Sequence, residues 1–178
     1  MFRLLLLLVL VISVVNIIQG RKIETENYTI WTIPDSASDV SGVKTEGGVA
    51  MIGGGSDCYP AFSWLIDHGN GGDFVVLRAG GTDAYNQFVY DLSVTLKKPL
   101  NSVTTISWNN REASFDEEVL TLLRNAEVIF FSGGDQYKYI QYWSDTPVQS
   151  IIQEKLLNGV SIGGTSAGLA IQGNFIYR

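Results

Sequence analysis

Residues 160–171 read VSIGGTSAGLAI, and this stretch decides the fold. An apolar run ends in a glycine-rich turn, after which Ala167 and the following residues can start a helix. That order is typical of a strand followed by a helix. Four similar apolar runs lie upstream, at residues 49–52, 74–77, 103–107 and 128–131.

Helical periodicity separates these runs and predicts alternating strands and helices. The expected helices cover residues 58–68, 84–90, 116–123, 136–143 and 147–158, the third with Asp116 as its N-cap. Residues 28–33 can form a short edge strand. The strands are apolar throughout rather than alternating, so we predict an α/β fold whose parallel sheet is covered by helices on both faces.

Four polar turns should meet at one edge of this sheet, because ligands bind at the carboxyl ends of parallel strands. The turns are Gly53–Asp57, Gly80–Asp83, Gly133–Gln136 and Gly164–Gly168. Asp57, Asp83 and Asp135 are expected to cap the helices that follow them. Gln136 has no evident structural duty there, so it is a candidate for substrate binding, together with Asp135.

The N-terminus predicts a secretory signal peptide over residues 1–20, with Arg3 before an apolar run that is short for a membrane span. An uncleaved anchor is the alternative. Residues 21–46 are expected to form an N-terminal extension and residues 47–178 the domain. Asn27 begins a glycosylation sequon, which agrees with a secreted or secretory-lumen glycoprotein that leaves the membrane after cleavage.

Composition excludes several classes of function. Without residues 1–20 the chain has 11 basic and 18 acidic side chains and no long basic run, so nucleic acid is not an expected partner. Cys58 is the only cysteine and His68 the only histidine, which gives no support to a metal site or cofactor. Cys58 is expected to be a small buried residue at the start of a helix.

Gly164-Thr165-Ser166-Ala167-Gly168 matches Gly-x-Ser-x-Gly, in which a sharp strand-to-helix turn exposes a nucleophilic serine. The Ala167 amide would then donate to a developing oxyanion, and Gly54 or Gly55 could supply a second donor. The simpler interpretation is a glycine-rich turn that only reverses the chain. His68 is expected at the far end of its helix, away from Ser166, and is not the base.

These segments resemble the cyanophycinase and dipeptidase E family of serine peptidases. The resemblance lies in four stretches between about residues 47 and 173: Ala50–Asp57, Val75–Asn86, Phe130–Gln136 and Gly163–Gly168. It implies a flavodoxin-like fold related to class I glutamine amidotransferases. It also implies Ser166 as nucleophile, an oxyanion hole from Ala167 and Gly53–Gly55, Gln136 at the substrate, and cleavage of aspartate-containing peptides or isopeptides without metal.

The chain departs from that family pattern after the serine. The family's catalytic histidine and its acidic partner follow the nucleophile, whereas only 12 residues follow Ser166 here. We therefore expect a C-terminally truncated enzyme that lacks its last strands and is inactive and poorly folded alone. The alternatives are an α/β-hydrolase esterase, a non-catalytic secreted binding module and a purely structural secreted protein. A small peptide is the expected partner, and a homodimer stays open.

Overall fold

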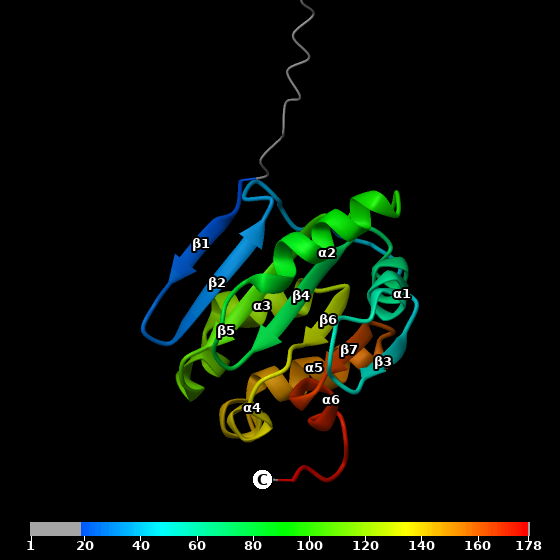
Figure 1. The fold of residues 1–178 in the computed structure, drawn as a ribbon. Coiled ribbons are helices and arrows are strands. Elements are labelled where there is room, and N and C mark those ends of the chain that lie inside the picture. Colours follow the sequence, from blue (N-terminus) through cyan, green and yellow to red (C-terminus); the bar gives the residue numbers. More distant parts are fainter. Residues whose placement is uncertain (1–18, 178) are drawn as a thin grey trace, which may run out of the picture.

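The computed structural model describes residues 19–177, and within them seven strands form one mixed sheet (Figure 1). Its order is β1-β2-β5-β4-β6-β7-β3. The strands are β1 (Arg21–Glu24), β2 (Tyr28–Ile33), β3 (Gly48–Ile52), β4 (Asp73–Arg78), β5 (Ser102–Trp108), β6 (Val128–Phe131) and β7 (Ser161–Thr165). The predicted α/β fold is confirmed.

The five strands from β5 to β3 in this order are parallel, as predicted. The sequence did not predict the antiparallel pair at the other end, where β1 pairs with β2 and β2 pairs with β5. Residues 28–33 are therefore not an edge strand, because β1 covers them. The extension expected over residues 21–46 is joined to the sheet of the domain.

Helices cover both faces of the sheet, as Figure 1 shows. The helices are α1 (Tyr59–Gly69), α2 (Ala84–Thr95), η1 (Arg111–Phe115), α3 (Glu117–Asn125), α4 (Gln136–Trp143), α5 (Pro147–Leu157) and α6 (Ala167–Ala170). The core cluster on one face takes side chains from α1 and α2, and the cluster on the other face takes them from η1, α3, α4 and α5.

The apolar strands divide their side chains between these two clusters, as expected for strands buried on both faces. Phe74 and Val76 of β4 face the α1–α2 side, and Val75 and Leu77 face the other. All four residues of β6 are buried in the same alternating way. The buried centre of the sheet thus lies beside β7, whose end begins the serine turn.

Helix caps follow the predictions only in part. Asp116 and Asp135 are N-caps whose carboxylates accept the amides of Glu118 and Tyr137, both at 2.9 Å. Asp83 occupies the N-cap of α2 without a side-chain cap bond. Asp57 is not a cap, because Cys58 holds that position in α1.

One further sequence expectation, that for Cys58, is wrong. Cys58 is exposed rather than buried, since it precedes a helix whose first turn faces solvent. The signal peptide lies almost wholly outside the described residues. Between residues 19 and 177, no helix has the length and apolar character that crossing a membrane requires.

Candidate active site

Ser166 stands at a sharp bend between β7 and α6. Its backbone has φ 54° and ψ −117°, in the positive-φ region that side-chain-bearing residues rarely adopt. Its carbonyl accepts hydrogen bonds from the amides of Leu169 and Ala170, both at 3.0 Å. The residue is exposed, so the hydroxyl lies outside the core at the carboxyl end of the strand. Such strain is found at functional sites and fits a nucleophile turn.

The two glycines that flank this bend are required by packing. A Cβ added to Gly164 would lie 2.4 Å from the carbonyl oxygen of Gly168. A Cβ on Gly168 would lie 2.1 Å from the carbonyl oxygen of Phe131. No side chain fits at these distances, so α6 can approach β6 and β7 only because both positions are glycine. The Gly-x-Ser-x-Gly pattern is thus a geometric requirement of this turn.

Strand order places a glycine-rich turn on each side of Ser166. Because β7 lies between β3 and β6, the turns after those two strands are its direct neighbours. A Cβ built on Gly54 would be 3.6 Å from the Ser166 Cβ, and one built on Gly133 would be 3.5 Å from it. A reacting carbonyl above the hydroxyl would therefore meet glycine backbone from both sides.

The predicted oxyanion residues lie around this serine. Gly54 and Gly55 have φ values of 109° and 86°, which favour glycine, and because neither has a side chain their backbone stays open beside Ser166. Ala167 is the first residue of α6 and is buried, and its amide belongs to the unpaired first turn of that helix. Backbone amides at such positions can stabilise a developing negative charge.

Tyr139 holds the turn after β6 through hydrogen bonds from its hydroxyl group. It is almost fully buried, and its hydroxyl lies 2.8 Å from the Ser132 carbonyl and 3.2 Å from the Gly133 carbonyl, to which it donates. Burial is the main cause that raises the pKa of Tyr139, so the phenol stays a donor. This contact holds Gly133, which lies next to Ser166, in place.

Tyr85 and Arg78 hold the two remaining turns. The Tyr85 hydroxyl donates to Asp57 at 3.2 Å, and burial followed by the Asp57 charge raises its pKa to about 12. Arg78 ends β4 and donates to the carbonyls of Gly80 at 3.0 Å and Thr82 at 2.6 Å. Three of the four turns at the predicted edge, those after β3, β4 and β6, are therefore braced by a side chain, which favours a preorganised site.

Comparison with known proteins assigns the family. The model described as peptidase family S51 matches residues 76–177, which hold Ser166 and the turns after β4 and β6. The chain belongs to peptidase family S51.

Curated proteins similar to this chain include cyanophycinases. The chain is 34% identical over 73 residues to the cyanophycinase of Trichormus variabilis, which covers 40% of this chain and 24% of the relative. It is 27% identical over 109 residues to the cyanophycinase of Geminocystis herdmanii, covering 54% and 40% respectively. The matches thus span less than half the length of these curated relatives.

A solved structure shows the same fold. A peptidase from an acI-B1 actinobacterium superposes with a TM-score of 0.58 at 20% identity, covering 76% of this chain and 60% of that one. The likeness agrees with the α/β architecture predicted from the sequence.

Asp135 is the N-cap of α4 in this S51 chain, and Gln136 is the first residue of that helix. The Asp135 carboxylate is used as the N-cap. The Gln136 amide donates to the Tyr177 carbonyl at 3.1 Å, so in this structure it contacts the C-terminal segment. A role in substrate binding stays a prediction for both residues.

No base reaches Ser166 within the described part of this S51 chain. The serine hydroxyl makes no side-chain hydrogen bond there. His68 lies in the last turn of α1, with Nδ1 2.8 Å from the Trp64 carbonyl and Nε2 3.9 Å from the Glu46 carboxylate. Because Glu46 precedes β3, His68 is at the amino ends of the strands, as predicted. Residues 19–177 also contain no group of three acidic, histidine or cysteine side chains placed for a metal ion.

Sequence reasoning missed the contribution of Gly133. The sequence predicts only a turn at this glycine, yet its position is as close to Ser166 as that of Gly54. Only the spatial strand order, which places β6 directly beside β7, reveals this neighbour. The sequence pattern that could have predicted this neighbour is the Gly-Gly pair that follows both β3 and β6.

Proposed function

We propose that this protein is a serine peptidase that uses Ser166 as nucleophile and forms an acyl-enzyme intermediate. The observation that carries the proposal is the strained, exposed Ser166 between the turns of Gly54 and Gly133. Membership of family S51 supports a hydrolytic role for this turn.

The chemistry follows from the geometry of the turn. The Ser166 Oγ attacks the scissile carbonyl carbon while its proton passes to a general base, and the carbonyl oxygen becomes an oxyanion. Amides of Ala167 and of Gly54 or Gly55 stabilise that charge. The base then returns the proton to the leaving nitrogen as the C–N bond breaks, and water hydrolyses the serine ester.

The general base and its acidic partner have to come from outside residues 19–177. His68 does not qualify, because it lies at the opposite edge of the sheet. The proposed source is a histidine and an acid in a part of the protein that these residues do not include. The relatives extend well beyond the matched regions, which is consistent with this source.

The proposed substrates are peptides or isopeptides that contain aspartate. Support comes from the cyanophycinase relatives together with the turn sequence from Ser132 to Gln136, which lies beside the serine. Gln136 and Asp135 begin the helix at that turn and are the proposed contacts to substrate.

A fluorophosphonate probe tests the nucleophile in the full-length protein. We expect labelling that is lost in Ser166→Ala and retained in Ser56→Ala, which removes an exposed serine from the neighbouring loop. Hydrolysis of aspartyl dipeptides should show the same dependence. Ester hydrolysis without dipeptide cleavage would favour the esterase alternative. A full-length protein that neither labels nor hydrolyses would favour the binding module.

Secretion and glycosylation at Asn27 are further proposals. The Asn27 Oδ1 accepts a hydrogen bond from Asn110 at 2.9 Å, and the residue is partly exposed in the turn between β1 and β2. Expression in a secreting eukaryotic cell should give medium-borne protein whose mobility shift on deglycosylation disappears in Asn27→Gln. Retention in the cell without a shift would contradict both.

A further inference from the structure

Arg78 ends β4 at the edge of the sheet that holds the serine turn, and its guanidinium is fixed there. Its Nε donates to the Gly80 carbonyl at 3.0 Å, and its Nη1 donates to the Thr82 carbonyl at 2.6 Å. The backbone of Gly81 packs against the guanidinium, since a Cβ added to this glycine would lie 2.7 Å from Cζ. A donor group held in one place before a ligand arrives binds at a lower cost in entropy.

The charge of Arg78 has no acidic partner within residues 19–177. No carboxylate oxygen of this region lies within 4.0 Å of the guanidinium, although Asp83 follows the turn directly. The Nη2 atom makes no hydrogen bond there either. In the same region the buried side-chain atoms without a partner belong to Trp143 and Gln172. The unpaired Nη2 is therefore accessible from solvent and open to a ligand.

Strand pairing sets the distance between Arg78 and the nucleophile. Leu77 of β4 lies opposite Phe131 of β6, and Phe131 lies opposite Gly164 of β7. Neighbouring strands are about 4.8 Å apart, so the end of β4 lies about 10 Å from the end of β7. An extended peptide spans about 3.5 Å per residue. A short peptide with its scissile carbonyl at Ser166 can thus place a carboxylate at the guanidinium.

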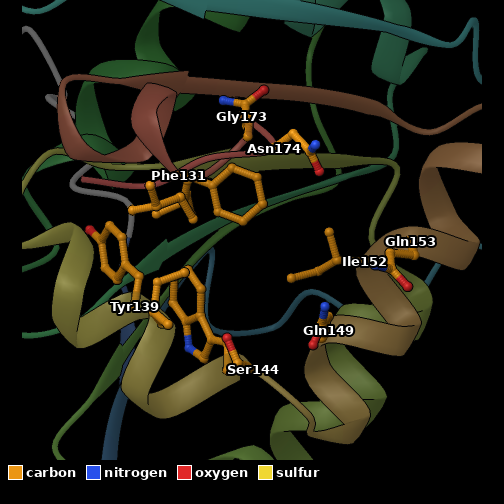
Figure 2. Close-up of a pocket in the computed structure, with 13 residues that line it drawn as sticks. Phe131, Tyr139, Ser144, Gln149, Ile152, Gln153, Gly173 and Asn174 are labelled. Atoms are coloured by element: carbon orange, nitrogen blue, oxygen red, sulfur yellow. The ribbon is translucent and has the colours of Figure 1, made fainter. Parts of the chain in front are cut away.

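The electrostatic effect of Arg78 reaches the tyrosines that hold the turns on both sides of Ser166. Tyr139 holds the turn after β6, and Figure 2 shows it on α4 with Phe131 of β6 beside it. Tyr85 holds the turn after β3. Burial raises the pKa of both phenols, and the positive charge of Arg78 opposes the rise in each. Because such effects fall with distance, the guanidinium lies near both braces of the serine turn.

The charges of this edge define the chemistry of a ligand. The four glycine-rich turns contain three aspartates and no lysine or arginine. Arg78 directly precedes the second turn and brings positive charge to an otherwise acidic edge. A guanidinium presents planar N–H groups that match the two oxygens of a carboxylate. The aspartates repel an anion at longer range, so a carboxylate must contact Arg78 directly to gain from its charge.

We propose that Arg78 binds a carboxylate of the peptide substrate, either an aspartate side chain or the free C-terminus of a short peptide. Nη2 and the remaining N–H of Nη1 donate to the carboxylate oxygens while the scissile carbonyl lies at Ser166. The inference rests on the proposed peptidase function and names the group by which that site selects its substrates. A peptide in which a neutral amide replaces this carboxylate binds more weakly.

The test follows the Nε–H resonance of Arg78 by proton–nitrogen NMR of the intact protein. N-acetylaspartate-N-methylamide offers a side-chain carboxylate, and N-acetylalanine offers a terminal one. N-acetylasparagine-N-methylamide is the neutral control of similar shape. We expect a saturable shift with at least one carboxylate and none with the control. The carboxylate that binds more tightly identifies the source.

Variants locate the binding, which the backbone amide resonance of Gly81 reports in each protein. Arg78→Gln removes the charge and should weaken binding of the carboxylate about tenfold. Arg78→Lys keeps the charge without the planar fork and should retain part of the affinity. Arg124→Gln makes the same change as the first variant in the last turn of α3, where the arginine pairs with Glu117, and should bind as the wild type does.

The outcomes separate this inference from the proposed function. Ser166→Ala should bind the carboxylate as the wild type does, because binding does not use the hydroxyl. Carboxylate binding by a protein whose Ser166 is not labelled would refute the peptidase and keep Arg78 as a carboxylate site. If the Arg78 variants do not fold, the wild-type titration decides alone. No saturable shift with either carboxylate, an equal response to the asparagine probe, or unchanged binding by Arg78→Gln overturns the inference.

Discussion

The backbone amide of Ser166 donates a hydrogen bond to the carbonyl oxygen of Ile52, at 3.1 Å. Ile52 is the last residue of β3, and the glycines of the proposed oxyanion loop follow it directly. This bond continues the ladder between β3 and β7 by one residue into the bend. The serine and its neighbouring loop are therefore held in register by the sheet itself, which is how a preorganised site avoids reorganisation during reaction.

Replacing Gly168 by alanine should destabilise the protein by about 1–3 kcal/mol, the range for forced overpacking. Its new methyl group would collide with the Phe131 carbonyl. Gly53→Ala is the matched control, because an added Cβ there meets nothing within 4 Å. Urea denaturation of both variants measures the difference. Equal stabilities would show that α6 moves freely against β6.

Ser166→Gly should raise the free energy of unfolding by about 1 kcal/mol while removing fluorophosphonate labelling. Glycine adopts the positive φ of this bend without strain, whereas serine does not. Ser166→Ala also loses the hydroxyl but keeps the strain, so its stability should stay close to that of the wild type. Chemical denaturation separates the two variants. A glycine variant no more stable than the alanine variant contradicts strain at this position.

His68→Gln should leave labelling and hydrolysis by the full-length protein unchanged. The imidazole lies at the amino end of the sheet, beside Trp64 and Glu46, and has no path to Ser166. The measurement is the rate of probe labelling of each protein under the same conditions. A loss of labelling of a hundredfold or so, the scale of general-base catalysis, would make His68 the base after all.

Residues 21–178 expressed alone should be labelled only slowly, at a rate close to that of their Ser166→Ala variant. The serine turn is complete, but no base lies within reach of the hydroxyl in the described part of this segment, and an unassisted serine is a weak nucleophile. Probe labelling at equal concentrations compares this segment with its Ser166→Ala variant, which gives the background. Rapid labelling of this segment at Ser166 contradicts the need for an external base.

Stability should fall at alkaline pH partly through Tyr85. Its pKa rises from 10.0 to about 12, mainly through burial and then through Asp57. The folded state therefore keeps a proton that the unfolded state releases. This contribution to stability is constant below the unfolded pKa and is lost as pH rises from 10.0 to about 12.

Tyr85→Phe removes the ionisable group, so its stability should decline less steeply over that interval. Urea denaturation at about pH 9 and about pH 11 measures the slope. Some decline should persist, because burial and nearby Asp116 also raise the pKa of Tyr28 to about 12. Identical slopes in the two proteins would exclude Tyr85 as a cause.

Local patterns predicted most of the elements. Helix α4 and strand β6 have the bounds that the sequence indicated, because apolar runs and capping residues act over a few neighbours. Strand β1 was missed because RKIE is short, charged and largely exposed, and it becomes a strand only by pairing with β2. Pairing of distant segments leaves no periodic signal.

The candidate site was predictable in the same uneven way. The glycine-rich turns in the sequence predict Ser166 and Gly54 as site residues, since glycine lets the backbone come close to a ligand. The proximity of Gly133 and the bracing by Tyr139 depend on which strands are neighbours in space, and that order differs from the order along the chain. Asp57 was expected as a cap, yet its carboxylate accepts from Tyr85, which is brought to it from another helix.

The pairing of β3 with β7 has a consequence for biosynthesis. Gly48 of β3 lies opposite Ser161 of β7. Strand β3 is the first of the parallel strands to be synthesised, so it has no partner until the ribosome has translated β7, the last strand described. Until then the nascent chain exposes the unpaired edge of β3. Unpaired strand edges are prone to aggregation, so this is the stage at which chaperones are most needed. The nucleophile turn and the loop beside it are thus among the last parts of this region to be completed, and a polypeptide halted before Ser161 has no such site.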